Sequence, residues 1–296
     1  VNIAINAHSL LTPLTGIGQY TYHLVEEISA MPECDVRLLY GLTWRNVPEV
    51  IPSTNLSSGS GEKANRYGAS LLRNLMPWIK SPVLRSIPRP YDVARYFQQK
   101  VFNHGVRQRY IDLYHEPNFI PYEFNGPTVI TVHDLSLVFY PEMHPVKRVK
   151  AIGSRLENAI KNSDRVIAVS DTIRNEILDI YNVERERVVA VHHGVDGRFC
   201  QQSSEIVERV VSRYGLAKSA YILSVGTLEP RKNIARLVDA YRALPENIQQ
   251  EYPLVLVGMK GWDTEKFMPD LKRLMDKGRL ILTGYVDKQD LPALYC

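Results

Sequence analysis

Residues Ser224–Asn233, with the sequence Ser-Val-Gly-Thr-Leu-Glu-Pro-Arg-Lys-Asn, decide how this chain folds. The apolar run Tyr221–Val225, which overlaps this stretch, predicts a buried strand, and Gly226 ends it. Glu229 and Pro230 then predict the start of a helix, because proline suits the first helical position, where its missing N–H would be unpaired anyway. Strand, glycine turn and helix in this order indicate one unit of an α/β domain.

Two cations, Arg231 and Lys232, fall in the first turn of this expected helix. Free backbone N–H groups and the positive end of the helix dipole gather there and favour an anion. Two fixed cations beside them suit a diphosphate group. A solvated Arg-Lys pair at a helix start is the alternative, and this stretch by itself does not decide between the two.

Length and composition indicate a two-domain globular chain. Its 296 residues are long for a single core, and a 45% share of hydrophobic residues with 23% charged residues is ordinary for a globular protein. No apolar run reaches the roughly 18 residues of a membrane helix, and Val1–Asn6 reads as a strand rather than a signal peptide. Because Cys34, Cys200 and Cys296 follow no metal or disulfide spacing, we expect reduced thiols and a cytoplasmic location.

Positive charge is concentrated in one part of the chain. The segment from Lys63 to Arg109 holds ten Lys and Arg residues against one acid, Asp92. A helix expected over Asp92–Arg109 carries aromatic residues among these cations, a combination that suits an anionic membrane surface. We therefore expect membrane contact through Arg66–Arg109, with an ordinary amphipathic helix pair as the alternative. No nucleic-acid-binding module is recognised, so nucleic acid is not an expected partner.

The chain opens with a strand, Val1–Asn6, and a turn-rich loop containing Gly16 and Gly18, followed by a helix. This order opens a Rossmann-like unit. The Gly-x-Gly pattern lacks a third glycine, and no acidic residue closes the next expected strand, Val36–Tyr40, so a dinucleotide site is not expected. We expect the two glycines to let the backbone approach a ligand or a facing domain, with a simple tight turn as the alternative. Gly41–Gly61 reads as a loop.

A continuous β-branched run, Thr128–Val132, predicts a strand buried on both faces of a parallel sheet. It ends in His133 and Asp134, which form a site candidate, because open α/β sheets bind ligands beyond the carboxyl ends of their strands. Adjacent His192 and His193 are a poor metal pair and are expected to be interdomain loop residues. The other elements expected here are strands Ile111–His115, Arg165–Val169 and Arg187–Val191, and helices Val146–Lys161 and Asp171–Tyr181.

A polar stretch, residues 197–218, marks the expected domain boundary, with a first domain over 1–197 and a second over 198–296. The second domain is expected to alternate strands with helices: strand Tyr221–Val225, helix Arg231–Ala243, strand Leu254–Gly258, helix Thr264–Lys277 and strand Leu280–Thr283. A last helix is expected after Asp287, a good N-cap, and the chain stops at Cys296 partway through it. Three strands make half of a doubly wound domain, so the second domain is expected to be incomplete.

In this order and spacing, seven short motifs together make the chain similar to the retaining glycosyltransferases of the GT-B fold, family 4 (group 1). Within that family it most resembles bacterial mannosyltransferases of O-antigen and exopolysaccharide assembly. The motifs are Thr15–Tyr20, Tyr114–Pro117, Thr131–Leu135, Ile167–Asp171, His193–Asp196, Val225–Asn233 and Leu282–Val286. The resemblance implies an α/β fold of two Rossmann-like doubly wound domains facing a cleft, the first on the acceptor side and the second binding a nucleotide sugar.

The resemblance also implies roles for individual residues. Arg231 and Lys232 match the pair that holds the donor diphosphate and stabilises the leaving group, which is the task that their position suggested independently. His133 matches a histidine near the transferred sugar, and Asp134 is expected to orient it. Further donor contacts are implied by the glycine loop, by the turn along which the nucleobase lies and, more weakly, by one glutamate: Gly16, Gly18, Gly226, Glu229, Gly284, Tyr285 and Val286.

One departure from the family pattern concerns its Glu-x7-Glu motif, which meets the donor sugar and the ribose. The chain ends before that motif, and Glu176 with Glu184, at the same spacing, lack the surrounding pattern. We therefore expect a truncated chain with little transferase activity of its own.

The function implied is transfer of a hexose, mannose from GDP-mannose, onto a lipid-linked or polysaccharide acceptor at the inner face of the membrane. No metal or other cofactor is expected. A UDP-sugar donor, a non-catalytic homologue and a nucleotide-sugar epimerase are the alternatives, although no convincing acid–base carboxylates support the last.

Overall fold

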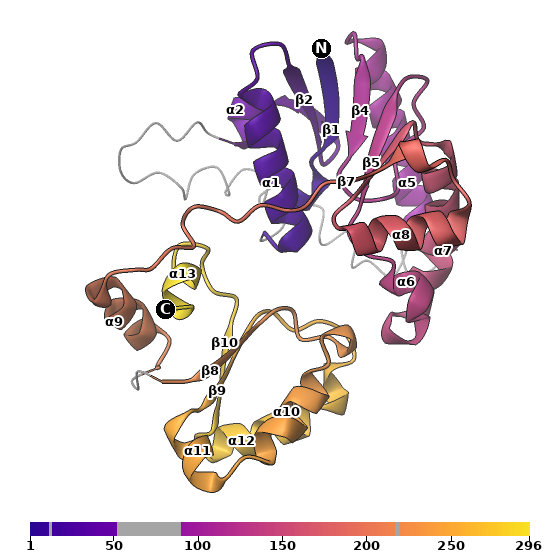
Figure 1. The fold of residues 1–296 in the computed structure, drawn as a ribbon. Coiled ribbons are helices and arrows are strands. Elements are labelled where there is room, and N and C mark those ends of the chain that lie inside the picture. Colours follow the sequence, from indigo (N-terminus) through magenta and orange to yellow (C-terminus); the bar gives the residue numbers. More distant parts are fainter. Residues whose placement is uncertain (12–13, 52–89, 217–219) are drawn as a thin grey trace. The chain divides into compact units, whose positions relative to one another are not determined.

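A computed structural model describes residues 1–11, 14–51, 90–216 and 220–296 (Figure 1). By its internal contacts the chain divides into two compact units. The first unit comprises Val1–Phe139 and Lys147–His193, and the second comprises Tyr140–Val146 and Gly194–Cys296. The chain thus passes into the second unit at Gly194, within the His193–Asp196 motif.

The first unit is built on a seven-stranded sheet in the order β3-β2-β1-β4-β5-β6-β7 (Figure 1). All neighbouring strands run parallel except β2 and β3, which are antiparallel. The strands are β1 (Asn2–Asn6), β2 (Asp35–Tyr40), β3 (Thr43–Asn46), β4 (Leu113–Glu116), β5 (Thr128–Val132), β6 (Arg165–Ala168) and β7 (Val188–Ala190). This is the predicted doubly wound α/β sheet, with β3 added at one edge.

Helices cover both faces of this sheet, because successive strand residues point to opposite sides. Ile3 and Ile5 of β1 pack with Val25 of α1 (Gly16–Ser29), whereas Ala4 of the same strand packs with Phe102 of α5 (Pro90–Arg107). The remaining helices and 3-10 turns of the first unit are α2 (Val47–Val50), α6 (Ser136–Phe139), α7 (Val146–Asn162), α8 (Asp171–Tyr181), η1 (His8–Leu10) and η3 (Arg185–Arg187). The turn η2 (Pro141–Met143) lies in the Tyr140–Val146 segment, which belongs to the second unit.

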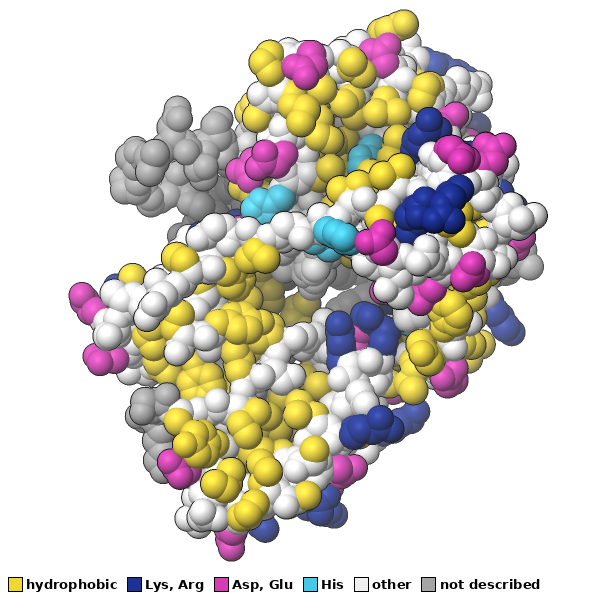
Figure 2. Space-filling model, in the orientation of Figure 1, with side chains coloured by type: hydrophobic (Ala, Val, Ile, Leu, Met, Phe, Trp, Pro, Cys, Tyr) yellow, Lys and Arg dark blue, Asp and Glu magenta, His cyan; other side chains and the backbone are white. Residues whose placement is uncertain are grey.

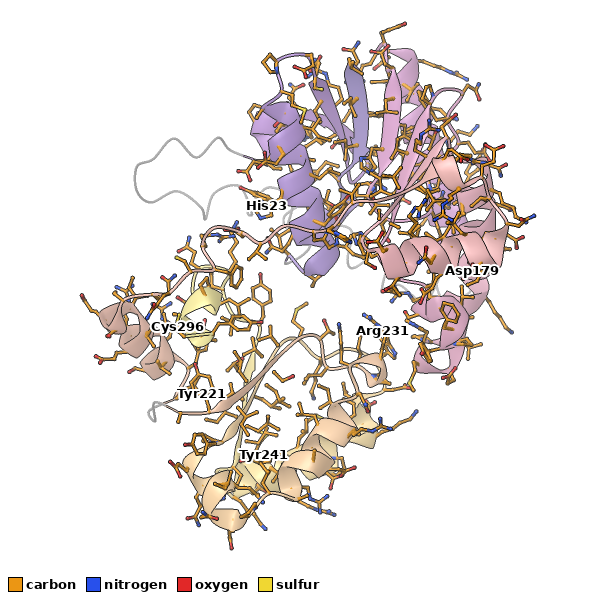
Figure 3. The ribbon with its side chains drawn as sticks, viewed as in Figure 1. His23, Asp179, Tyr221, Arg231, Tyr241 and Cys296 are labelled. Carbon is orange, nitrogen blue, oxygen red and sulfur yellow. The ribbon has the colours of Figure 1, made fainter. Side chains whose placement is uncertain are left out.

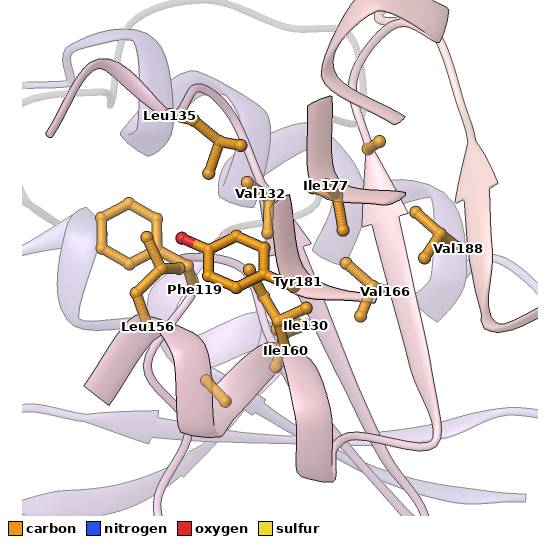
Figure 4. Close-up of a cluster of buried hydrophobic side chains, with 12 residues drawn as sticks. Phe119, Ile130, Val132, Leu135, Leu156, Ile160, Val166, Ile177, Tyr181 and Val188 are labelled. Carbon is orange, nitrogen blue, oxygen red and sulfur yellow. The ribbon is translucent and has the colours of Figure 1, made fainter. Parts of the chain in front are cut away.

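A second part of the first unit's core lies under α7 and α8 (Figure 4). Leu156 and Ile160 of α7 and Ile177 of α8 pack on apolar residues of β5, β6 and β7. Ser170 caps α8, since its hydroxyl accepts a hydrogen bond from the Ile173 N–H at 3.2 Å, and the predicted bounds of this helix are confirmed.

The second unit holds a parallel three-stranded sheet in the order β10-β9-β8. Leu254 and Leu256 of the central strand pack with α10 and α12, and Val255 and Val257 pack with α9 and α13, so both faces are covered here too. The elements are β8 (Ile222–Val225), β9 (Leu254–Val257), β10 (Leu280–Gly284), α9 (Ser204–Arg213), α10 (Ile234–Arg242), α11 (Glu246–Glu251), α12 (Met268–Asp276), α13 (Leu291–Leu294), η4 (Pro230–Lys232) and η5 (Thr264–Lys266).

Several predicted elements were wrong. The predicted strand Tyr221–Val225, which is β8 in the structure, is not fully buried. It is an edge strand of the described sheet, and its Val225 is 38% exposed. The stretch 197–218 contains the helix α9, whose Val207, Val210 and Val211 recur at helical spacing. The predicted loop Gly41–Gly61 contains β3 and α2, and its part beyond residue 51 lies outside the described residues.

The last helix was also placed too early. Asp287 accepts hydrogen bonds from the backbone N–H groups of Gln289, Asp290 and Leu291, at 2.9–3.1 Å, and so closes a turn. The helix α13 begins only at Leu291.

Three glycines end the three strands of the second unit's sheet, at its carboxyl edge. Gly226 follows β8 with φ +156°, Gly258 follows β9 with φ +149°, and Gly284 ends β10 with φ +72°. The Gly226 N–H donates to the Val257 carbonyl and the Gly258 N–H to the Gly284 carbonyl, each at 2.8 Å. A Cβ on Gly258 would lie 2.0 Å from the Gly226 carbonyl oxygen, so no side chain fits there.

We predict that Gly258→Ala lowers the free energy of unfolding of the second unit by about 3 kcal/mol or more, because the added methyl group collides with backbone that cannot move aside. The control is Gly153→Ala, in α7, where the added Cβ meets nothing within 4 Å and should stabilise the helix by up to about 1 kcal/mol. Urea unfolding measures both, and a Gly258→Ala protein as stable as the wild type would contradict the prediction.

Candidate functional site

The cationic pair of the second unit lies in a 3-10 turn rather than in an α-helix. Pro230–Lys232 form η4, and α10 begins at Ile234, so the predicted helix start at Pro230 was wrong. The reason is Asn233, whose left-handed backbone conformation (φ +55°) separates the turn from the helix. The turn uses the Lys232 N–H, which donates to the Glu229 carbonyl at 3.0 Å. An anion here is therefore attracted mainly by the two side-chain charges.

Glu229 holds Arg231 in place. Glu229 is 4% exposed, and its Oε1 accepts a hydrogen bond from Arg231 Nε at 3.0 Å and forms an ion pair with Arg231 Nη2 at 2.8 Å. The Arg231 side chain itself stays about one-third exposed, where the loop after β8 leads into α10 (Figure 3). A buried carboxylate gripping two guanidinium nitrogens fixes the direction of the cation. Glu229, expected as a weak donor contact, is thus a positioning residue for Arg231.

Lys232 lies beside the glycine edge of the sheet. Its Cε is 3.8 Å from the position that a Cβ on Gly226 would occupy. The Lys232 side chain therefore lies beside Gly226. The two cations and Gly226 come together at the carboxyl end of β8, as the sequence predicted.

The turn Gly284–Val286 presents two different kinds of surface. Tyr285 is 46% exposed, whereas Val286 is buried with Ala293 and Leu294 in the apolar cluster under α9 and α13. The side chain of Val286 therefore anchors the turn. At Val286, only the backbone is left for contact with a ligand. The exposed ring of Tyr285 is the apolar surface that this turn offers.

Three aromatic rings meet in the first unit at the predicted histidine. The ring of Tyr20 lies 4.9 Å from that of His133 and 5.0 Å from that of His193, centroid to centroid, and the two imidazoles are 5.6 Å apart. Motifs from α1, from the end of β5 and from the loop after β7 are thus joined in one place. The sequence analysis gave Tyr20 only as the end of the Thr15–Tyr20 motif and His193 as an interdomain loop residue.

His133 is oriented by a backbone group. Its Nε2–H donates to the Pro117 carbonyl at 2.9 Å, which leaves Nδ1 as an acceptor. Burial lowers the pKa of His133, partly offset by this hydrogen bond, and the Asp134 charge opposes the decrease slightly. Asp134 Oδ1 accepts from the Ser136 backbone N–H at 2.9 Å and from its hydroxyl. The Pro117 carbonyl thus orients the His133 ring, and the orienting role expected of Asp134 stays a prediction.

A buried chain of hydrogen bonds connects the ring cluster to the interior of the sheet. Hydrogen bonds join the Tyr20 hydroxyl to Thr131 Oγ1 at 3.0 Å and Thr131 Oγ1 to His115 Nε2 at 2.9 Å. His115 is 4% exposed, and burial lowers its pKa to about 4, so the imidazole is neutral at neutral pH. Sequence reasoning missed this role, although His115 and Thr131 both stand inside quoted motifs.

The two predicted glycines stand in the first turn of α1, not in a loop before it. A Cβ on Gly18 would lie 3.0 Å from the Ser9 carbonyl oxygen, so this position is needed for close packing. A Cβ on Gly16 would meet nothing within 4 Å. Gly16 is thus the one of the two with open space beside it in the described structure.

Across residues 1–11, 14–51, 90–216 and 220–296, no three or more His, Cys, Asp and Glu side chains gather in a way that could hold a metal ion.

Comparisons with known sequences agree with the division of the chain. A family described as Glycosyltransferase Family 4 matches residues 14–198, and a family described as Glycosyl transferases group 1 matches residues 211–296. Among curated proteins, the O-antigen chain mannosyltransferase B of Escherichia coli is 31% identical over 286 residues, which cover 96% of this chain and 71% of that protein.

Solved structures show the same fold at low sequence identity. Sucrose-phosphate synthase from Thermosynechococcus elongatus superposes with a TM-score of 0.66 and 16% identity, covering 99% of this chain and 73% of that one. Anabaena HepE in complex with UDP-glucose gives a TM-score of 0.62 at 16% identity, with 99% and 71% covered. These similarities establish the GT-B fold.

The low pKa of His115 makes the stability of the first unit depend on pH. In the unfolded chain this histidine binds a proton below about 6.5, but in the folded chain only below about 4. Between these pH values the unfolded state binds more protons than the folded state. The free energy of unfolding therefore decreases by up to about 3 kcal/mol as the pH falls through this window. His115→Gln should remove that part of the pH dependence.

Urea unfolding between pH 7.5 and 4.5 measures this effect. As the pH falls, the free energy of unfolding should decrease more for the wild type than for His115→Gln. Tyr20→Phe is the control, because it loses one hydrogen bond of the same chain without removing a group that titrates in this range. Parallel profiles for the wild type and His115→Gln would show the prediction to be wrong.

Proposed function

The chain belongs to the family 4 (group 1) glycosyltransferases, and from this premise we propose that it takes part in the retaining transfer of mannose from GDP-mannose onto a surface glycan. The observation that carries the proposal is the Arg231–Lys232 pair, with Arg231 gripped by the buried Glu229 at the carboxyl edge of the second unit's sheet. The name of the Escherichia coli relative, an O-antigen chain mannosyltransferase, favours mannose as the sugar.

The cationic pair suits a diphosphate leaving group. When the bond between the sugar and the diphosphate breaks, negative charge collects on the phosphate oxygens, and fixed cations beside them lower the energy of that state. Arg231 is directed by Glu229, so little ordering is needed at the moment of reaction. Cationic side chains supply the charge that a metal ion supplies in other transferases, so the proposal includes no metal or other cofactor.

His133 has the geometry to meet the transferred sugar. Because its Nε2–H is committed to the Pro117 carbonyl, its Nδ1 is the atom that accepts a hydrogen bond. A neutral imidazole with a fixed acceptor suits a sugar hydroxyl or a developing positive charge on the sugar ring. The Tyr20 ring meets the His133 ring in a T-shaped contact, and the His193 ring lies beside it with the two planes tilted by 34°.

A membrane-associated acceptor is the second part of the proposal. The basic segment Arg66–Arg109 is described only from residue 90 onward, and its earlier part lies outside the described residues. In α5, Tyr96 and Phe97 are 58% and 59% exposed, and Lys100 lies 5.2 Å from the centre of the Tyr96 ring. Exposed aromatics beside cations suit the interface of an anionic bilayer.

Other features of the surface bear on this association. Both signs of charge are interspersed on the face shown in Figure 2, so attraction to a membrane would be local. Within the described parts of the chain, no helix has both the length and the apolar character needed to cross a bilayer.

The second candidate is a UDP-sugar donor. The structure of HepE in complex with UDP-glucose favours it, since that protein shares the fold over nearly the whole of this chain. The two donors differ in the base, and both need the same cationic pair.

Thermal unfolding with nucleotides tests the donor. GDP should raise the melting temperature of the purified chain more than UDP, because a ligand that binds only the folded state stabilises it. Arg231→Ala and Lys232→Ala should each weaken GDP binding at least tenfold, since each removes a charge-assisted contact. Arg236→Ala, at an exposed position in α10 just after the cationic turn, is the matched control and should behave like the wild type. A larger shift with UDP would favour the second candidate, and no shift with either nucleotide would reject the donor proposal for this chain.

Vesicle sedimentation tests the membrane surface. We predict that the chain binds phosphatidylglycerol vesicles at low salt, and that Lys100→Glu combined with Arg107→Glu in α5 weakens binding at least tenfold, because each cation near the surface contributes about 1 kcal/mol. Lys147→Glu combined with Lys150→Glu in α7 makes the same change of charge elsewhere and should have a smaller effect. Vesicle binding that depends neither on salt concentration nor on anionic lipid would exclude this surface as the membrane contact.

A further inference from the structure

Two of the three cysteines come together in the second unit. Cys200 lies in the segment between Gly194, where that unit resumes, and α9. Cys296 follows α13, 96 residues after Cys200 (Figure 3). Both carry free, exposed thiols. Their spacing in the sequence predicts no pair, and only the fold brings them to one place.

The two sulfur atoms have a common neighbour, Gln202. The Gln202 backbone N–H donates to Cys296 Sγ at 3.4 Å, and the Gln202 side-chain Nε2 donates to Cys200 Sγ at 3.5 Å. Cys296 Sγ also lies 3.9 Å from the Cys200 carbonyl oxygen. The sulfur of one cysteine thus lies against the backbone of the other.

A second contact joins the same two segments one position earlier. The rings of Phe199 and Tyr295, each of which directly precedes a cysteine, have centroids 5.9 Å apart and planes at 70°. The two segments therefore lie side by side over at least two positions. The approach of the cysteines does not depend on the placement of one side chain.

Both segments are held by other contacts. Leu294 is 1% exposed in the apolar cluster with α9, and its carbonyl accepts a hydrogen bond from the Tyr221 hydroxyl at 2.8 Å. In the other segment, Gln202 Nε2 donates to the carbonyl groups of Arg198 and Cys200 at 3.2 and 2.8 Å. Ordered neighbours keep the two thiols at a high effective concentration, which favours a bond between them.

We propose that Cys200 and Cys296 are a modification site, at which an intramolecular disulfide forms and breaks by exchange with a low-molecular-weight disulfide, glutathione disulfide. A disulfide requires Cβ atoms within roughly 3.5–4.5 Å of each other. Because the Cys296 sulfur already contacts the Cys200 backbone, rotation of the two exposed side chains and a small movement of the exposed segment around Cys200 complete the approach. The site is separate from the proposed donor and acceptor contacts and does not depend on them.

The exchange takes two steps. The thiolate of one cysteine attacks a sulfur of glutathione disulfide, forms a mixed disulfide and releases one glutathione thiolate. The thiolate of the other cysteine attacks the protein sulfur of that mixed disulfide and releases the second glutathione thiolate. The two protons lost by the cysteines end on the two glutathione molecules. Two protein thiols are thus oxidised while one glutathione disulfide is reduced, and excess glutathione reverses both steps.

The disulfide would tie the segment before α9 to the residue after α13. It closes a covalent loop over 96 residues of the second unit, which restricts the unfolded chain and so stabilises the folded unit. Exposed thiols are accessible to both oxidant and reductant, so the bond responds to the surroundings. The reduced thiols expected from the sequence are then the state under reducing conditions, and the disulfide is the state under oxidising conditions.

Peptide mapping by mass spectrometry tests the proposal. The purified chain is incubated with glutathione disulfide, its remaining thiols are alkylated, and it is digested. The wild type should give the Cys200 peptide joined to the Cys296 peptide, without retained glutathione. Cys200→Ser and Cys296→Ser should lack this product and should each retain glutathione on the remaining partner. Cys34→Ser is the matched control, because Cys34 packs in the first unit's core, and it should behave like the wild type.

Two results would overturn the proposal. One is a wild-type chain that retains glutathione on both Cys200 and Cys296, since the second step would then have failed. The other is a disulfide that joins two chains or involves Cys34, which a non-reducing gel and the same peptide map reveal.

Thermal unfolding measures the effect on the second unit. Cys34→Ser treated with glutathione disulfide should melt about 5 °C or more above the same protein after dithiothreitol, because the closed loop restricts the unfolded chain. Cys34→Ser combined with Cys200→Ser should show no such shift. Equal melting temperatures for the cross-linked and the reduced Cys34→Ser protein would contradict the stabilising role of the bond.

Discussion

Both units of this chain depend on the same constraint, the parallel pairing of buried strands. Parallel strands bring their carboxyl ends to one edge, and helices then have to cover both faces of the sheet. Several groups of the candidate site lie at that edge. Gly226 follows β8 and Gly284 ends β10 in the second unit, and His133 follows β5 in the first. The site is thus a product of strand direction as much as of individual side chains.

Much of the fold was readable in the sequence because it is local. The β-branched run Thr128–Val132 and the helix Asp171–Tyr181 have the predicted bounds, since apolar periodicity and a serine cap define them within a few residues. The α/β class and the family also followed from short motifs. The elements that prediction missed, β3 and α9, lie in polar stretches where burial of one face only emerges in the folded unit.

The positions of the candidate site residues were only partly predictable. His133, Arg231 and Lys232 follow strands as predicted, and their roles stay predictions. The left-handed conformation of Asn233 moves the cations out of the helix, and the backbone angle of one residue is not visible in an apolar periodicity. The partners were missed because they are distant in the chain. Pro117 orients His133, His115 reaches Tyr20 through Thr131, and Gly258 meets Gly226. Such contacts exist only after the sheet is assembled.

The central position of β1 has a consequence for biosynthesis. This first strand pairs with β2 on one side and with β4 on the other, and β4 begins only at Leu113. A ribosome must therefore make more than a hundred residues before both sides of β1 are covered. Until then the emerging chain exposes an apolar strand with an open edge, a surface that invites pairing with the wrong neighbour. The order of synthesis thus makes the arrival of β4 the event that ends the vulnerable period of the first unit.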